Sequence, residues 1–168
     1  FSSLDFYDLF DIFYRQIYRK EVPYEPSDNL GVGTVYQIPK EEFEHIMMTY
    51  LNIDSETLQQ KTLYHTDAKT YEYCPRGFYE AEYPEHPYPE VVDYTENADG
   101  TITLLVNVVF PYEGLSEVFS HEVAVRPLKN DGVQYVSNHV IPSEDNIEES
   151  WYKPRLTLAE WVEVYGAE

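Results

Sequence analysis

Cysteine is almost missing from the sequence. Cys74 is the single cysteine among 168 residues. An internal disulfide, a zinc finger and a Cys-x-x-Cys redox motif are therefore excluded. This scarcity fits the cytosol, and it fits equally the surface of bacteria that rarely use disulfides. A reactive thiolate at Cys74 would need a base oriented by its neighbours, and neither Arg76 nor His65 is placed to do so by local spacing. We interpret Cys74 as an ordinary packed or exposed thiol.

Basic residues are also scarce. The chain has 11 Lys and Arg against 31 Asp and Glu, which gives a formal net charge of −20 at pH 7. Such a field repels phosphate backbones and anionic membrane surfaces, so we expect no nucleic-acid partner and no adsorption to lipid. The acidic residues form no block long enough to be a tail, which favours a solvated surface over a dedicated site for cations or basic partners.

Long hydrophobic runs and recognisable catalytic motifs are missing as well. No apolar run approaches the roughly 18 residues that a membrane-spanning helix needs. The stretch "HEVAV" lacks the second histidine of a zincin and reads as a strand, while "GVGTVY" lacks the third glycine of a dinucleotide fingerprint. Serine has no Gly-x-Ser-x-Gly setting, and the acidic residues around Asp99 do not have EF-hand spacing. We therefore expect no catalytic residues, no cofactor and no bound metal.

What is present is a helical signal at both ends of the sequence. Residues 2–20 have an apolar stripe at helical spacing and either Ser2 or Ser3 as a cap, and residues 39–51 begin with a proline that suits a first helical turn. A short helix follows, capped by Asp54 or Ser55. Near the C-terminus, Thr157 and Glu160 form a capping box for a helix over 156–166. The expected buried faces are Phe6, Leu9, Phe10, Phe13 and Ile17 in the first helix, and Phe43, Ile46, Met47, Tyr50 and Leu51 in the second.

From residue 88 the period changes to that of strands. Two hairpins are expected, around turns at 97–100 and 129–132, and both turns end in Asp-Gly. Unbroken alternation over 102–110 predicts a central strand with one buried face. The sequence thus predicts one α+β domain over 1–168. N-terminal helices (1–60) pack on a curved antiparallel β-meander (91–142), as in a cystatin- or NTF2-like cone, followed by the C-terminal helix. A Tyr- and Pro-rich connection spans 61–90.

Two histidines form the first candidate site. If the second turn pairs Lys129 with Val133, then Val123 faces His139, and His121 faces Ile141. His121 and His139 then become diagonal neighbours on one face, roughly 7 Å apart at Cα. Tyr135 lies on that face, whereas Glu122, Arg126 and Asn138 lie on the other. The pair could line a pocket or bind a metal, or the two side chains could simply be hydrogen-bonded and partly buried. We favour the last interpretation because no third metal ligand is apparent from local spacing.

The second candidate is the stretch "YEYCPRGFYEAEYPEHPYPEVV", residues 71–92. Its prolines forbid a regular helix, so we expect an extended segment. Aromatic rings on a proline-stiffened loop can form a surface for a sugar or a peptide, and the candidate ligand residues are Tyr79, Tyr83 and Tyr88. The alternative is a long loop whose Tyr rings anchor it to the rest of the domain.

One stretch resembles a known family. The sequence "YTENADGTITLLVNVVFPYEGLSEVFSHEVAVRPLKNDGVQYVSNHVI" is similar to the C-terminal part of an uncharacterised family of secreted lipoproteins from gut Gram-positive bacteria. The residues that carry the resemblance are Asp99, Gly100, the strand to Pro111, His121, Glu122, Arg126, Asp131, Gly132, Tyr135, Ser137 and Asn138. The family has no assigned reaction. The resemblance implies a domain displayed outside the membrane on a lipid-anchored stem, and the start at Phe1 agrees with a removed N-terminal part.

These observations favour a non-catalytic extracytoplasmic binding or scaffold domain of a lipoprotein, at the cell surface or secreted. Its ligand would be a glycan, a peptide or a cell-wall component, and it would meet the membrane only through the missing lipid anchor. The alternative is a small-molecule or enzymatic pocket between helices and sheet around His121, His139 and Tyr135.

Overall fold

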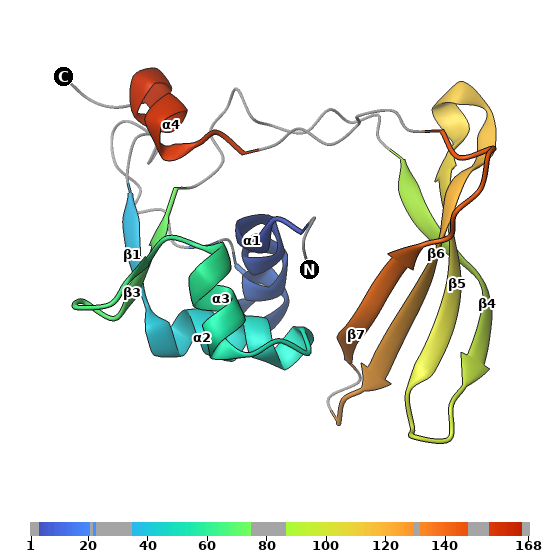
Figure 1. Cartoon of the computed structure of the whole chain (residues 1–168), viewed down its shortest axis with the longest axis horizontal. Coiled ribbons are helices and arrows are strands. Elements are labelled where there is room, and N and C mark those ends of the chain that lie inside the picture. The colour runs from blue at the N-terminus through green and yellow to red at the C-terminus, as the bar shows by residue number, and fades with distance from the viewer. Residues whose placement is uncertain are drawn as a thin grey trace. The chain divides into compact units, whose positions relative to one another are not determined.

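The computed structural model describes residues 4–20, 22, 35–74, 87–129, 132–147 and 155–165. These residues form four α-helices and two antiparallel sheets, so the chain is an α+β protein (Figure 1). The chain divides into two compact units. The first unit comprises Phe1–Thr49, Ile53–Ala81 and Pro154–Glu168, and the second comprises Tyr50–Asn52 and Glu82–Lys153. No helix within the described part combines the length and the apolar character needed to cross a membrane.

The first helix, α1 (Phe6–Tyr18), begins later than predicted. Its cap is Asp5, whose carboxylate accepts hydrogen bonds from the backbone N–H groups of Tyr7 and Asp8 at 2.9 and 3.0 Å. The prediction of Ser2 or Ser3 as the cap was therefore wrong, because a capping side chain must lie directly before the first helical residue. The buried residues of α1 are Phe6, Phe10, Phe13 and Tyr14.

The next two helices are close to the prediction. Helix α2 (Lys40–Tyr50) buries Phe43, Ile46, Met47 and Tyr50. Helix α3 (Ser55–Lys61) is capped by Asp54, whose carboxylate accepts from the backbone N–H of Thr57 at 2.7 Å. Pro39 does not open α2, however. It ends a strand that runs directly into the helix.

That strand belongs to a small sheet that the sequence analysis missed. Strands β1 (Tyr36–Pro39), β2 (Tyr64–His65) and β3 (Thr70–Tyr73) form a three-stranded antiparallel sheet with β3 in the centre. Tyr71 and Tyr73 are fully buried, at 0% and 1% exposure. The start of the predicted connection over 61–90 is therefore part of the core of the first unit.

Aromatic rings make up much of this core. The Phe43 ring stacks on Phe10 and on Tyr71, with ring centroids 4.7 and 4.3 Å apart, and Tyr7 approaches it edge-on at 6.1 Å. The Phe10 ring also meets the edge of Tyr73 at 5.8 Å. The sheet and helices α1 and α2 are thus joined by a continuous aromatic cluster, in which packing and quadrupole geometry both contribute.

A partly buried carboxylate, Glu44 of α2, ties this cluster to α3. One oxygen, Oε1, accepts hydrogen bonds from the hydroxyls of Tyr71 and Ser55, both at 2.7 Å, and lies 3.7 Å from Nζ of Lys40. Burial acts to raise the pKa of Glu44, but the hydrogen bonds from Tyr71, Ser55 and Gln59 outweigh it, so the pKa is lowered. Folding therefore stabilises the charged form of Glu44.

This network predicts a pH-dependent contribution to stability. We expect Glu44→Gln to lower the free energy of unfolding at pH 7 by about 1 kcal/mol, because charge-assisted hydrogen bonds become neutral ones. The folded pKa is lowered, so the contribution is present above the unfolded pKa of Glu44 and is lost as the pH falls through the folded pKa. Urea unfolding of both proteins should show the gap closing between pH 7 and pH 3. Glu41→Gln, at an exposed position of the same helix, is the control. A gap that stays constant down to pH 3 contradicts this assignment.

The C-terminal helix has the predicted cap. In front of α4 (Leu158–Tyr165), the Thr157 hydroxyl and backbone N–H donate to Oε2 of Glu160 at 2.7 and 2.8 Å, and the Glu160 N–H donates back to the hydroxyl oxygen at 3.3 Å. This reciprocal pair is the predicted capping box. Trp161 is 2% exposed, whereas Leu158 and Val162 of the same helix are exposed.

Arg155 fastens this C-terminal segment to α1. The guanidinium donates through Nε to Oδ1 of Asp8 at 2.7 Å and through Nη2 to Oδ2 of Asp11, and its Nε lies 3.6 Å from Oδ1 of Asp5. Its Nη1 donates to the carbonyl of Cys74 at 2.9 Å. The Arg155 side chain is only 9% exposed, so this cluster of one cation and three carboxylates is largely shielded from water. The sequence analysis did not anticipate it.

The second unit is the predicted meander. Strands β4 (Tyr88–Glu96), β5 (Ile102–Phe110), β6 (Leu115–Pro127) and β7 (Val133–Val140) form a four-stranded antiparallel sheet in the order β4-β5-β6-β7. The first turn matches the prediction, since Gly100 has φ +81° and the Asn97 N–H donates to the Thr101 carbonyl at 2.8 Å. Strand β5 is central, as predicted. The core of this sheet is Val106, Val123 and Val125, with Ile102, Leu104 and Val133 packed against it.

Candidate functional site

The pairing of β6 with β7 separates the two candidate histidines. His121 pairs with Val140, and His139 pairs with Glu122, the residue next to His121 on β6. Successive strand residues point to opposite faces, so His121 and His139 lie on opposite sides of the sheet. The predicted register was wrong for two reasons. Pro127, not Lys129, pairs with Val133, and a bulge between Ala124 and Val125 shifts the pairing again.

His121 is half-buried and hydrogen-bonded, the environment that we favoured for both histidines, whereas His139 is exposed. The Nδ1 of His121 donates to Oδ1 of Asn138 at 2.7 Å, and its ring lies 5.1 Å from that of Phe119. Asn138 therefore lies on the same face as His121, contrary to the prediction. Tyr135 pairs with Val125 on this face and is exposed. Within the described residues, no group of three or more His, Cys, Asp or Glu side chains is arranged to hold a metal ion.

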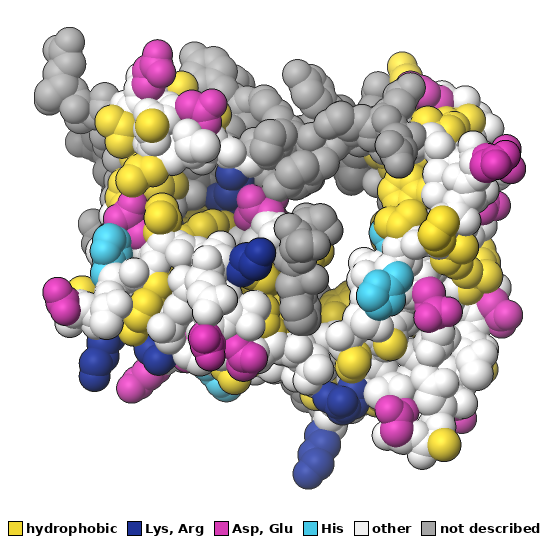
Figure 2. Space-filling model, in the orientation of Figure 1, with side chains coloured by type: hydrophobic (Ala, Val, Ile, Leu, Met, Phe, Trp, Pro, Cys, Tyr) yellow, Lys and Arg dark blue, Asp and Glu magenta, His cyan; other side chains and the backbone are white. Residues whose placement is uncertain are grey.

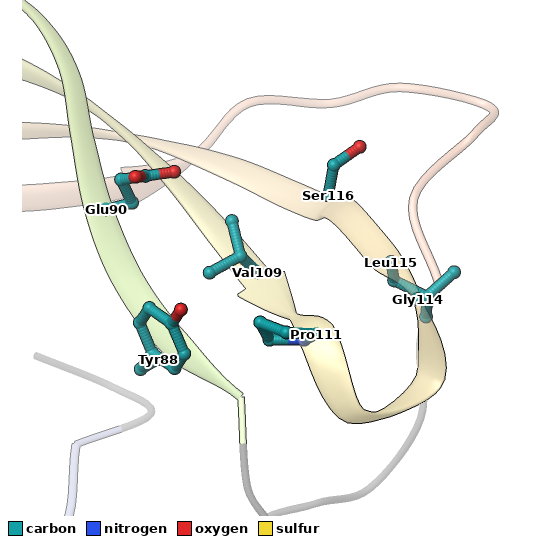
Figure 3. A pocket seen from close by; sticks show the side chains of 7 residues that line it. All are labelled: Tyr88, Glu90, Val109, Pro111, Gly114, Leu115 and Ser116. Atoms are coloured by element: carbon teal, nitrogen blue, oxygen red, sulfur yellow. The ribbon is translucent and has the colours of Figure 1, made fainter.

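A shallow, open surface cleft of the second unit lies elsewhere, at the end of the sheet where β5 turns into β6. Its volume is about 370 Å³. The turn is a single 3₁₀ turn, η2 (Pro111–Glu113), closed by Gly114 at φ +73°. The residues that line the cleft are Tyr88, Glu90, Val109, Pro111, Gly114, Leu115 and Ser116 (Figure 3). One of the predicted ligand residues, Tyr88, is thus placed at a cleft.

The cleft combines an aromatic ring, an apolar floor and a carboxylate. Tyr88 is 49% exposed, and its strand partner Val109 is 5% exposed and forms the floor. Figure 3 shows Tyr88 and Glu90 projecting from β4 beside Val109 and Pro111, with Ser116 on the strand across from them. Of the lining residues that the structure describes, Glu90 is the one that carries a charge. Acidic side chains are otherwise dispersed over the visible surface instead of gathering in one patch (Figure 2).

The other predicted ligand residues are not brought to this cleft by the described structure. Tyr79 and Tyr83 lie outside the described residues. Tyr135 and the two histidines do not line the cleft. Sequence reasoning missed Glu90, Val109, Pro111 and Leu115. The signal that could have found them is "PYEG", where a proline and a left-handed glycine bend the chain at the end of a long strand.

The described residues define an α+β protein with antiparallel sheets and a surface cleft at the end of the larger sheet. The chain belongs to the Family of unknown function (DUF6070), whose family model matches residues 1–155. The matched range covers both units up to Arg155. The comparison with curated proteins and the comparison with solved structures each found no match.

Proposed function

We propose that the chain is a non-catalytic extracytoplasmic binding domain that holds its ligand in the cleft beside Tyr88. The observation that carries the proposal is the cleft itself, in which a half-exposed ring stands over a buried apolar floor next to a carboxylate. Sites of this composition hold ligands by ring stacking and a small number of polar contacts. The ligand is a small molecule, or one group of a glycan, a peptide or a cell-wall component.

The extracytoplasmic location is a second part of the proposal. It is supported by the resemblance of residues 94–141 to secreted lipoproteins of gut Gram-positive bacteria, which implies a lipid-anchored domain at the cell surface. The net charge of −20 agrees with a domain held at a distance from anionic lipid by its stem. The cystatin- or NTF2-like cone, with helices packed on the meander, stays a prediction about the arrangement of the two units.

A binding screen with matched variants tests the cleft. The purified chain is screened against immobilised glycans, peptides and cell-wall fragments, and each hit is titrated with Tyr88→Ala and Tyr94→Ala. Tyr94 is the matched control, because it is exposed on the same strand but pairs with Leu104, away from the cleft. Tyr88→Ala should weaken binding at least about tenfold, as expected for an aromatic anchor, and Tyr94→Ala should change it little. Hits that tolerate Tyr88→Ala, or a screen with no hit, overturn the proposal.

A further inference from the structure

The positions of Tyr88 and Glu90 decide what chemistry the cleft can bind. The two residues alternate on β4, with Tyr88 paired to Val109 and Glu90 to Asn107, and the bulge of this strand lies beyond them, between Val91 and Asp93. They therefore point to the same face, with their Cα atoms roughly 7 Å apart. A group seated between them touches the ring on one side and the carboxylate on the other.

The charge around the cleft favours a cation. Among the described residues, Glu90 is the one charged side chain that lines the cleft, and it has no ion pair with another of them. The adjoining turn and strand add Glu113 and Glu117, both exposed. The whole chain carries a net charge of −20. An anionic ligand would be repelled here, whereas an ammonium group would gain from the carboxylate and from the negative face of the Tyr88 ring.

The first unit holds a cation between the same two residue types, which there come from two different elements. Nζ of Lys40 lies 5.8 Å from the ring centroid of Tyr64 and 3.7 Å from Oε1 of Glu44. There an ammonium group on an alkyl stem is held between a tyrosine ring and a glutamate. At the cleft the ring and the carboxylate recur, and Val109, Pro111 and Leu115 supply apolar surface that a stem can cover.

Resting on the proposed function of the cleft, we propose that its ligand carries a primary ammonium group on an apolar alkyl stem, the chemistry of a lysine side chain. The ammonium group lies between Tyr88 and Glu90, and the stem lies along Val109, Pro111 and Leu115. This names the ligand class of the site and assigns Glu90 as its specificity-determining residue.

Titration of the isotopically labelled whole chain tests this by nuclear magnetic resonance. The probe is Nα-acetyl-lysine amide. Two neutral analogues serve for comparison: Nα-acetyl-norleucine amide, and the lysine amide that is acetylated at both Nα and Nε. The lysine amide should shift the amide signals of residues 88–90 and 109–116, and should bind at least about tenfold more tightly than either analogue. Because cation attraction is lost in Glu90→Gln, that variant should bind the lysine amide at least about fivefold more weakly. Raising the salt concentration should also weaken binding.

Two controls separate the possible results. Glu96→Gln removes the same charge further along β4, at a residue that pairs with Ile102, and should leave the affinity unchanged. Glucosamine presents its ammonium group on a rigid ring. If glucosamine binds more tightly than the lysine amide, the proposal that the ligand has an alkyl stem is overturned. If the lysine amide and its neutral analogues bind equally at the cleft and Glu90→Gln has no effect on affinity, the cleft is a binding site that does not recognise the ammonium group. If no probe shifts the cleft signals, the ammonium inference fails. The proposed function fails with it only if the screen also gives no hit that depends on Tyr88.

Discussion

Replacing Arg155 with methionine is expected to lower the free energy of unfolding of the first unit by about 3 to 5 kcal/mol, the cost of breaking a buried ion pair by removing one partner. Methionine keeps the length and apolar bulk of the side chain but removes the cation that faces Asp5, Asp8 and Asp11. It also removes the hydrogen bond to the Cys74 carbonyl and the contact with the Tyr73 ring, 5.6 Å from the guanidinium carbon.

The pKa directions indicate that the cluster is electrostatically strained. Burial alone would lower the pKa of Arg155, but Asp11 and Asp8 raise it. Burial raises the pKa of Asp11, and the neighbouring Arg155 and Tyr73 offset this only in part. A raised folded pKa means that the contribution of Asp11 is most favourable below its unfolded pKa and declines as the pH rises through the folded pKa. The Arg155→Met variant should therefore recover part of its lost stability when the pH is lowered from 7 to 4.

Amide hydrogen exchange in α1, together with urea unfolding, measures this loss in the first unit. Arg126→Met is the control, because Arg126 is exposed and donates one hydrogen bond, to Oε1 of Gln134 at 2.6 Å. That change should stay within about 0.5 kcal/mol. Arg155→Lys keeps the positive charge but lacks the planar guanidinium group with its several donors. Its free energy of unfolding should lie between those of the wild type and Arg155→Met. If Arg155→Met lowers the free energy of unfolding by less than about 1 kcal/mol, the ion pairs of Arg155 with the three aspartates do not stabilise the first unit.

The predicted helices and hairpins rest on local chemistry, which a single sequence displays. The cap at Asp54, the capping box of Thr157 and Glu160, and the left-handed Gly100 each depend on residues within a few positions of one another. The small sheet of the first unit was missed because its strands have only two to four residues. Its one visible signal was the alternation of Tyr71 and Tyr73 with polar residues, which the prolines that follow obscured.

The candidate sites could not be predicted from residues that lie close together in the sequence. A bulge adds one residue to one strand and moves every side chain beyond it to the other face, so the turn at 129–132 could not fix which residues accompany His121. The ion pairs of Arg155 with Asp8 and Asp11 join residues more than 140 positions apart in the sequence. In the sequence, the three aspartates were interpreted only as favourable charges near the start of a helix. Tyr88 was chosen as a candidate because it lies in a Tyr- and Pro-rich stretch, and its role in binding stays a prediction, whereas Val109 beside it in the cleft resembles any core valine in the sequence.

Replacing Phe43 with alanine is expected to lower the free energy of unfolding of the first unit by about 3 to 5 kcal/mol, the range for removing a buried aromatic side chain. Phe43 is 0% exposed and lies between the rings of Phe10 and Tyr71, so the cavity left behind is walled by two large side chains. Those neighbours come from α1 and β3, which limits how far the cavity can collapse. The two stacked contacts add a further loss that the removed area alone does not include.

Met48→Ala is the matched control for this change, since Met48 lies on the same helix but is exposed. It should cost less than about 1 kcal/mol. Urea unfolding followed by far-ultraviolet circular dichroism gives the total loss, and hydrogen exchange at the amides of α1 and α2 assigns it to the first unit. Phe43→Leu should recover more than half of the loss, because leucine refills most of the cavity. If Phe43→Ala and Met48→Ala prove equally mild, the aromatic cluster does not hold α1, α2 and the small sheet together.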